Sequence, residues 1–217
     1  MLRSSNVWFF VILSLNFWLV PILPYETVGD LVTDGLLALT LLAAVTLQGL
    51  IEKRFRLWAV AAGVCILAAI AVEELLPGAA FIENATFAAC FAAATALYFH
   101  IMVRSLSDVT FDTVFAAACT YILIGMFFAA VFGLVLEADP QAFAPHDRVS
   151  GRYDLLYYSF ATLTTLGAAD IVPASDATKM LTVFEATIGL IYIAVLVGAV
   201  VGTFSAGIAA NARSGGN

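Results

Sequence analysis

The segment Thr162–Asp170 contains the residue types from which a binding site for a dehydrated cation can be built. Threonines stand at positions 162, 164 and 165, and a glycine stands at position 167. Outside a regular helix, this stretch would expose a threonine hydroxyl and a short run of main-chain carbonyls. Such oxygens can replace the hydration shell of an ion. The segment therefore indicates a cation site rather than an enzyme active site.

Two local elements must position this segment. A short amphipathic helix is expected to start near Tyr153 and to run to about Thr164. Its C-terminus would direct the negative end of the helix dipole into the membrane interior, which favours a cation there. A non-helical strand follows. Irregular backbone at membrane depth is tolerated only where it is buried in protein or lines a water-filled path.

The composition indicates an integral membrane protein. Of the 217 residues, 63% are hydrophobic and 12% are charged, whereas soluble domains have about 25% charged residues. This excludes an ordinary soluble domain, and it excludes a disordered chain, which needs low hydrophobicity. The net charge of −7 comes without basic patches, so we expect no nucleic-acid partner.

Six stretches are apolar and long enough to span a membrane as helices. They are Val7–Leu23, Gly35–Ile51, Leu57–Leu76, Ala79–Val103, Phe111–Leu136 and Leu181–Ala210. With the N-terminus inside, six basic residues face the cytoplasm and three face outward, which predicts cytoplasmic termini in a plasma (inner) membrane. Acidic residues gather on the outer face, Glu83 among them. The predicted fold is an all-α membrane protein with six transmembrane helices and a re-entrant helix.

Several membrane functions do not fit the sequence. The two lysines, Lys53 and Lys179, lie at the ends of spans, so no lysine is placed for a retinal Schiff base. The two histidines are not placed as metal or haem ligands, and we expect no cofactor. The span Ala79–Val103 contains no arginine, which predicts that the protein lacks steep voltage dependence.

The segment resembles the pore loop of the tetrameric potassium-channel family, whose signature reads Thr-x-Thr-Thr-Val-Gly-Tyr-Gly-Asp. Here it reads Thr-Leu-Thr-Thr-Leu-Gly-Ala-Ala-Asp over residues 162–170, and Pro173 follows. The stretch Phe184–Gly198 is similar to the inner helix of prokaryotic members, with Gly189 at the hinge glycine. The resemblance covers about Phe111–Phe204. It implies a pore domain over residues 105–217 and a four-helix peripheral domain over residues 1–104.

The resemblance implies a homotetramer in membrane lipid, with one central pore that conducts monovalent cations, K⁺ and also Na⁺. The expected ion-binding residues of the filter are Thr165, Leu166, Gly167, Ala168 and Ala169. The expected supports of the filter are Tyr157, Tyr158, Thr162, Thr164, Asp170 and Glu185. The expected hinge and gate residues are Gly189, Gly198 and Phe204.

The sequence departs from the family in the outer half of this filter. Ala168 and Ala169 replace a tyrosine that braces the filter and a glycine that permits a left-handed backbone. Ala161 stands where some members have an acidic residue, so Asp170 lacks that partner. These changes predict weak selectivity. Two alternatives stay open: a non-conducting structural or regulatory homologue with a collapsed filter, and a strictly K⁺-selective channel.

Glu185 is an ionisable residue within the last predicted span, which makes it a functional candidate. A hydrogen bond to the back of the short helix, with the carboxyl as a neutral acid, is favoured over direct contact with an ion. Small residues recur every four positions from Ala194 to Ala210. They fit close helix packing and a wide inner pore equally well.

Overall fold

The computed structural model describes residues 5–19, 80–104, 111–146, 149, 151–167 and 170–214, with single positions at 35, 64 and 68. These residues are mostly helical, as the sequence predicts. The elements are α1 (Ser5–Leu19), α4 (Ala80–Arg104), α5 (Phe111–Ala138), β1 (Phe143–Ala144), α6 (Arg152–Leu163), β2 (Val172–Pro173) and α7 (Asp176–Ser214). The predicted spans Gly35–Ile51 and Leu57–Leu76 lie outside the described residues apart from these single positions.

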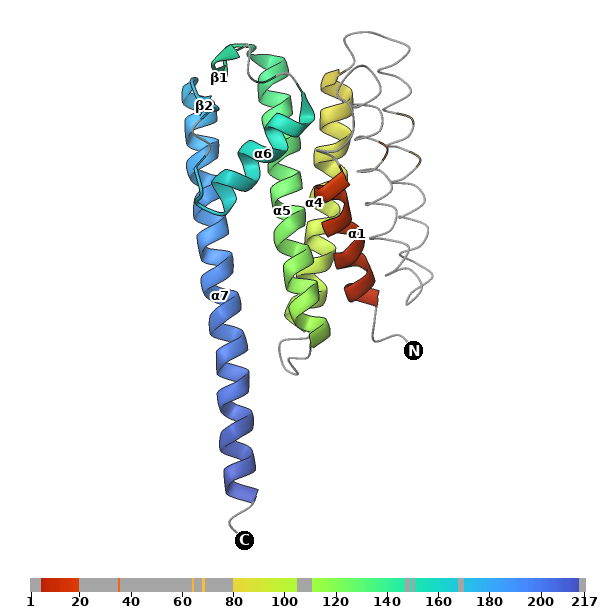
Figure 1. Ribbon diagram of the computed structural model, residues 1–217, viewed down its shortest axis with the longest axis vertical. Coiled ribbons are helices and arrows are strands. Elements are labelled where there is room, and N and C mark those ends of the chain that lie inside the picture. The colour runs from red at the N-terminus through yellow and green to blue at the C-terminus, as the bar shows by residue number, and fades with distance from the viewer. Residues whose placement is uncertain are drawn as a thin grey trace.

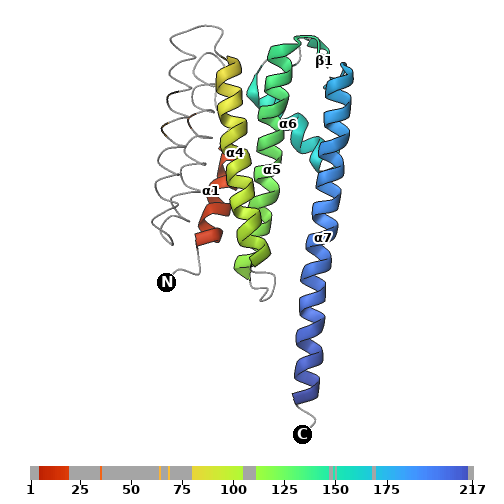
Figure 2. The ribbon, with the colours of Figure 1, turned by 180° about the vertical axis from the view of Figure 1, so that it is seen from behind.

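The long helices run side by side, and the short helix α6 crosses obliquely between α5 and α7 (Figures 1 and 2). Three helical stretches among the described residues are long and apolar enough to cross a membrane: Ala80–Arg104, Asp112–Ala138 and Asp176–Ala199. Helix α6 has 12 residues. It is about 18 Å long and cannot cross a hydrocarbon core of about 30 Å.

The observed helix bounds agree closely with the predicted ones. Helix α6 begins one residue before the predicted start at Tyr153 and ends at Leu163, with Thr164 as its C-terminal cap. Helix α7 contains the whole predicted span Leu181–Ala210 and continues without interruption to Ser214. The number of membrane-spanning helices in the whole chain stays a prediction, because the second and third lie almost entirely outside the described residues.

One hydrophobic core joins α1 and α4 to α5. Phe9 of α1 stacks on Tyr98 of α4 with ring centroids 4.8 Å apart, and both side chains are fully buried. Helix α4 is rich in alanine, which allows its backbone to lie close to α5. At the ends of α1 and α5, Asn6 donates a hydrogen bond to the Asp112 carboxylate at 2.8 Å. The core thus crosses the predicted domain boundary after residue 104.

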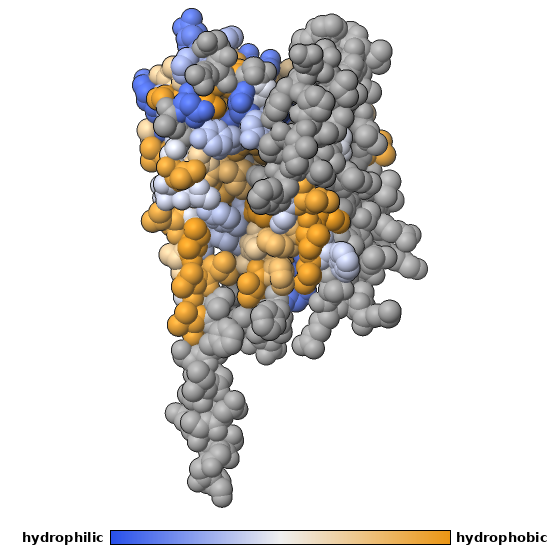
Figure 3. All heavy atoms as spheres, viewed as in Figure 1, coloured by the Kyte–Doolittle hydropathy of each residue, from blue (hydrophilic) through white to orange (hydrophobic). Residues whose placement is uncertain are grey.

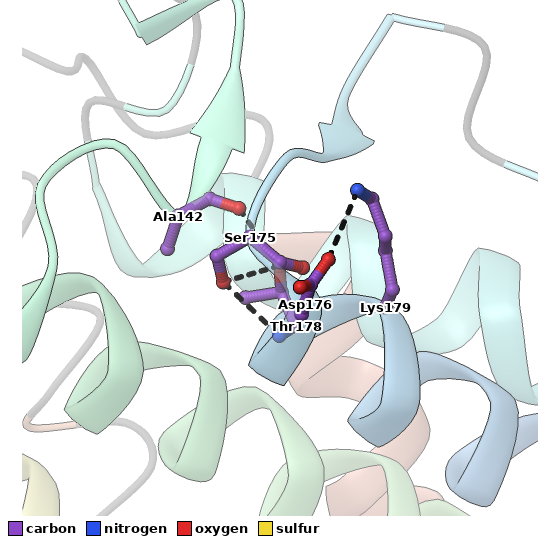
Figure 4. Close-up of polar contacts among 5 residues, drawn as sticks. All are labelled: Ala142, Ser175, Asp176, Thr178 and Lys179. Carbon is purple, nitrogen blue, oxygen red and sulfur yellow. Dashed lines mark hydrogen bonds and ion pairs between the residues drawn. The ribbon is translucent and has the colours of Figure 1, made fainter.

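The connections before and after α6 are bonded to each other and to the start of α7. Strands β1 and β2 pair antiparallel, with Phe143 opposite Pro173. The Ala142 carbonyl accepts hydrogen bonds from the Thr178 hydroxyl at 2.9 Å and from the backbone N–H of Ala174 at 2.8 Å. The Ser175 hydroxyl caps α7 by accepting the N–H of Thr178 at 3.2 Å (Figure 4). This loop therefore fixes where α7 begins.

Candidate functional site

Helix α6 ends in four carbonyls that have no partner inside the helix. Three of them accept backbone N–H groups from the following segment, each at 3.0 Å: Phe160 from Thr164, Ala161 from Gly167, and Thr162 from Thr165. The fourth, the Leu163 carbonyl, accepts the Tyr121 hydroxyl of α5 at 2.9 Å. All four terminal carbonyls are satisfied by protein. The free ligands at this site must therefore come from the segment after the helix.

That segment has an unusual backbone. Thr165 has a φ of 60° and Gly167 has a φ of 78°, both in the left-handed region. For a threonine this conformation costs about 1–2 kcal/mol, and residues held this way cluster at functional sites. The carbonyls of residues 164–167 accept no hydrogen bond from any described residue. They are available to ligands, as the cation-site prediction requires. Ala168 and Ala169 lie outside the described residues.

The three threonines differ in their surroundings. Thr162 is buried within α6, and Thr164 is exposed with its hydroxyl donating to the Phe160 carbonyl of its own helix at 2.7 Å. Thr165 is also exposed, and its hydroxyl has no hydrogen bond to any described residue. Thr165 is therefore the threonine whose hydroxyl is available to a ligand.

The predicted aromatic and acidic supports are spread over two surfaces. Tyr157 is exposed, whereas Tyr158 is buried and its hydroxyl lies 2.6 Å from the Thr182 hydroxyl of α7. The Tyr158 ring packs edge-on against Phe132 and Phe143 at 5.0 and 5.1 Å. Tyr158 thus holds α6 against α7 and against the loop that contains β1. Asp170 is exposed beyond the segment.

Glu185 lies behind α6, where its side chain is fully buried. One carboxyl oxygen is 2.5 Å from the Ser159 hydroxyl oxygen, which is also 2.8 Å from the Gly125 carbonyl oxygen of α5. A Cβ at Gly125 would meet the Phe160 ring at 2.6 Å, so glycine allows α6 to approach α5. The structure places Glu185 at the back of the short helix, and the sequence analysis missed its partners Ser159 and Gly125.

Gly189 is buried where α7 touches the end of α6. A Cβ there would lie 2.5 Å from the Leu163 carbonyl oxygen, a contact that no side chain could make. Gly198 has open space around it, and both glycines lie within continuous helix. Phe204 belongs to α7, and its side chain lies outside the described residues. A hinge at Gly189 or Gly198 and a gate at Phe204 stay predictions.

The N-terminal end of α6 has a charged contact that the sequence did not predict. Arg152, the first residue of α6, makes an ion pair with Glu83 of α4 at 2.9 Å. Its guanidinium also donates to Asn84 at 3.0 Å and lies 4.4 Å from the centre of the Phe87 ring. A basic residue at the N-terminus of a helix lies beside the positive end of the helix dipole, so it needs an acidic partner. An arginine at the start of the short helix is therefore the sequence signal for this ion pair.

Residues 143–206 match a protein family described as "Ion channel". The match runs from β1 through α6, the segment after it and β2 into α7. No curated protein and no solved structure matches the chain. Residues 143–206 are thus similar to an ion channel domain, and the three helices long and apolar enough to span a membrane indicate an integral, multi-pass membrane protein. The similarity is to a family of ion channels and not to an enzyme family, in agreement with the prediction that the chain is not an enzyme.

Proposed function

We propose that the protein is a monovalent cation channel of the potassium-channel type, in which four copies surround one pore. The observation that carries this proposal is the segment of residues 164–167. It follows a re-entrant helix, its carbonyls are free of hydrogen bonds to described residues, and two of its residues have left-handed backbones. The negative end of the α6 dipole lies beside it and favours a cation.

Assembly is required because one copy cannot enclose an ion. Free carbonyls at membrane depth are costly unless they are buried in protein or line a water-filled path. Helix α7 also has a largely exposed apolar surface, visible below the hydrophilic end of the molecule in Figure 3. Its large exposed side chains include Val183, Phe184, Leu190, Ile191, Val195 and Val201. In the proposed tetramer, α7 meets neighbouring copies and the remaining helices meet membrane lipid.

We further propose that both K⁺ and Na⁺ permeate, with a weak preference for K⁺, in a plasma (inner) membrane with both termini cytoplasmic. Thr165, Leu166 and Gly167 form the inner ion sites. Ala168 and Ala169 supply neither a bracing tyrosine nor a second glycine, so the outer sites are less constrained. Fewer well-formed carbonyl sites lower the penalty for Na⁺.

Bi-ionic recordings from purified protein in planar bilayers test this proposal. We expect a reversal potential far from the K⁺ equilibrium potential, which corresponds to a preference below about a hundredfold, or about 2.8 kcal/mol. The double change Ala168→Tyr with Ala169→Gly should raise the K⁺ preference at least about tenfold. A wild-type channel that is already strictly K⁺-selective would contradict the weak-selectivity proposal.

A matched pair of threonine variants tests the inner ion site. Internal barium should block the wild-type channel at the Thr165 ring, and Thr165→Ala should relieve that block. Thr164→Ala should keep it, because the Thr164 hydroxyl is bonded within its own helix. Stable tetramers by native mass measurement that pass no current would favour the non-conducting alternative. A stable monomer or dimer with no larger species would contradict the channel itself.

A further inference from the structure

The oxygen atoms beside Glu185 lie so close together that a hydrogen must lie between each neighbouring pair. Three oxygens lie in a row: the Gly125 carbonyl oxygen of α5, the Ser159 hydroxyl oxygen of α6 and one carboxyl oxygen of Glu185. The two separations are 2.8 and 2.5 Å, which are both hydrogen-bond distances. Each short contact between oxygens needs a hydrogen, so the row needs two.

Only one arrangement supplies both hydrogens. A carbonyl has none, and a serine hydroxyl has one. If Glu185 were ionised, the serine hydrogen could serve one contact, and the other would bring two lone pairs together. If Glu185 is a neutral acid, its O–H donates to Ser159, and the Ser159 O–H donates to the Gly125 carbonyl. The geometry of Ser159 therefore requires a proton on Glu185.

The surroundings of Glu185 favour the same state. The titratable groups that face it are two phenols, Tyr121 from α5 and Tyr158 from α6. Among the described residues, no cationic side chain pairs with Glu185, and its second carboxyl oxygen is buried without a hydrogen bond. A buried carboxylate with neither a cation nor a full set of donors is strongly disfavoured.

We propose that Glu185 is a proton-binding site that holds α6 between α5 and α7 and thereby supports the filter segment. When the proton leaves to water, the Ser159 hydroxyl turns to donate to the new carboxylate, and the Gly125 carbonyl loses its side-chain donor. The link from α7 through α6 to α5 is then broken behind the pore. The consequence for conduction rests on the proposed channel function, whereas the presence of the proton does not.

Infrared spectroscopy of the purified full-length chain tests the proton directly. At neutral pH, the wild-type protein should show the carbonyl stretch of a neutral carboxylic acid, and Glu185→Gln should lack it. The control is the double change Glu83→Gln with Arg152→Gln, which removes an equally buried carboxyl without leaving the Arg152 cation unpaired, so the band should stay in place. A wild-type spectrum in which Glu185→Gln removes no such band would overturn the proposal whether or not the protein conducts.

Bilayer recordings test the consequence. Wild-type current should fall at alkaline pH by about tenfold or more per pH unit above the midpoint, as expected for loss of a required proton. In Glu185→Gln the ratio of neutral to alkaline current should stay near one, because the amide donates to Ser159 at every pH. Ser159→Ala breaks the row and should also abolish the pH dependence. A pH dependence that survives in both variants would overturn the role of this site in conduction.

Discussion

Two buried glutamates contact the short helix α6 in different ways. Glu83 of α4 contacts its N-terminal end with 2% of its side chain exposed, and Glu185 of α7 contacts its middle with 0% exposed. Glu83 meets the Arg152 guanidinium, whereas Glu185 meets a serine hydroxyl. Burial is the same and the partner differs. The partner therefore decides the charge state, ionised for Glu83 and, in our proposal, neutral for Glu185.

Helix α6 is held by two different kinds of contact, one at its N-terminal end and one at its middle. The contact at the N-terminal end is specific in position, because an ion pair with a buried charge tolerates little displacement of either partner. Gly133 of α5 leaves room for the Asn84 side chain, which also contacts Arg152. The middle of the helix is held by neutral hydrogen bonds, one of which depends on a proton. Only the second kind of contact depends on a proton, so only that contact is sensitive to alkaline pH.

The largest expected effect is the loss of one partner of the ion pair. Glu83→Gln leaves the Arg152 cation largely buried at the positive end of α6, with 13% of its side chain exposed. We expect it to lower the free energy of unfolding by about 3 kcal/mol or more. The measurement is a detergent-denaturation curve of the purified protein.

Two further variants sharpen that result. The double change Glu83→Gln with Arg152→Gln should recover part of the lost stability, because no uncompensated charge remains. Asp176→Asn removes one partner of the exposed pair with Lys179 and should have little effect. Equal losses in Glu83→Gln and Asp176→Asn would show that the Glu83 pair is no stronger than a surface contact.

An intermediate effect on stability is expected where the C-terminal end of α6 meets α7. Gly189→Ala places a methyl group 2.5 Å from the Leu163 carbonyl oxygen and should cost about 1–3 kcal/mol, because backbone must move. It should also change ion selectivity, since the segment at residues 164–167 follows that carbonyl directly. Denaturation curves and reversal potentials measure the two effects.

The matched control for this variant is Gly198→Ala in the same helix. Gly198 has open space around it. The variant should therefore be as stable as the wild type or slightly more stable, since alanine has a higher helix propensity than glycine. If both glycines acted as hinges, both variants would alter opening with little loss of stability. That pattern would contradict the packing role of Gly189.

The sequence predicts the elements of this site well because their signals are local. The bounds of α6 follow from the threonines and Gly167 after Leu163, which favour a helix less. The role of residues 164–167 as an ion filter stays a prediction. The partners of the two glutamates could not be predicted. Arg152 lies 69 residues from Glu83 in the sequence. Ser159 faces Glu185 only because of the way α6 is oriented when it packs against α7.

Gly189 illustrates the same limit. A glycine within a long apolar helix is compatible with bending and with close approach of a neighbouring backbone, and the local sequence is the same in both cases. The distance to the Leu163 carbonyl separates these two roles, and it depends on how α6 enters the space beside α7. Local chemistry thus predicts which residues matter, while tertiary packing decides what each of them does.

The smallest expected effect on stability comes from replacing Glu185. Glu185→Gln replaces a neutral acid by a neutral amide of nearly the same shape, whose N–H can donate to the Ser159 hydroxyl. Because no charge is lost, we expect the free energy of unfolding at neutral pH to change by less than about 1 kcal/mol. The same substitution at Glu83 should cost several times more, and one denaturation series measures both. If Glu185 were ionised, glutamine would remove an unpaired buried charge, and Glu185→Gln would be clearly more stable than the wild type. The difference between the two glutamine variants therefore measures the cost of leaving the Arg152 cation without its partner, since only one of the two buried carboxyls is paired with it.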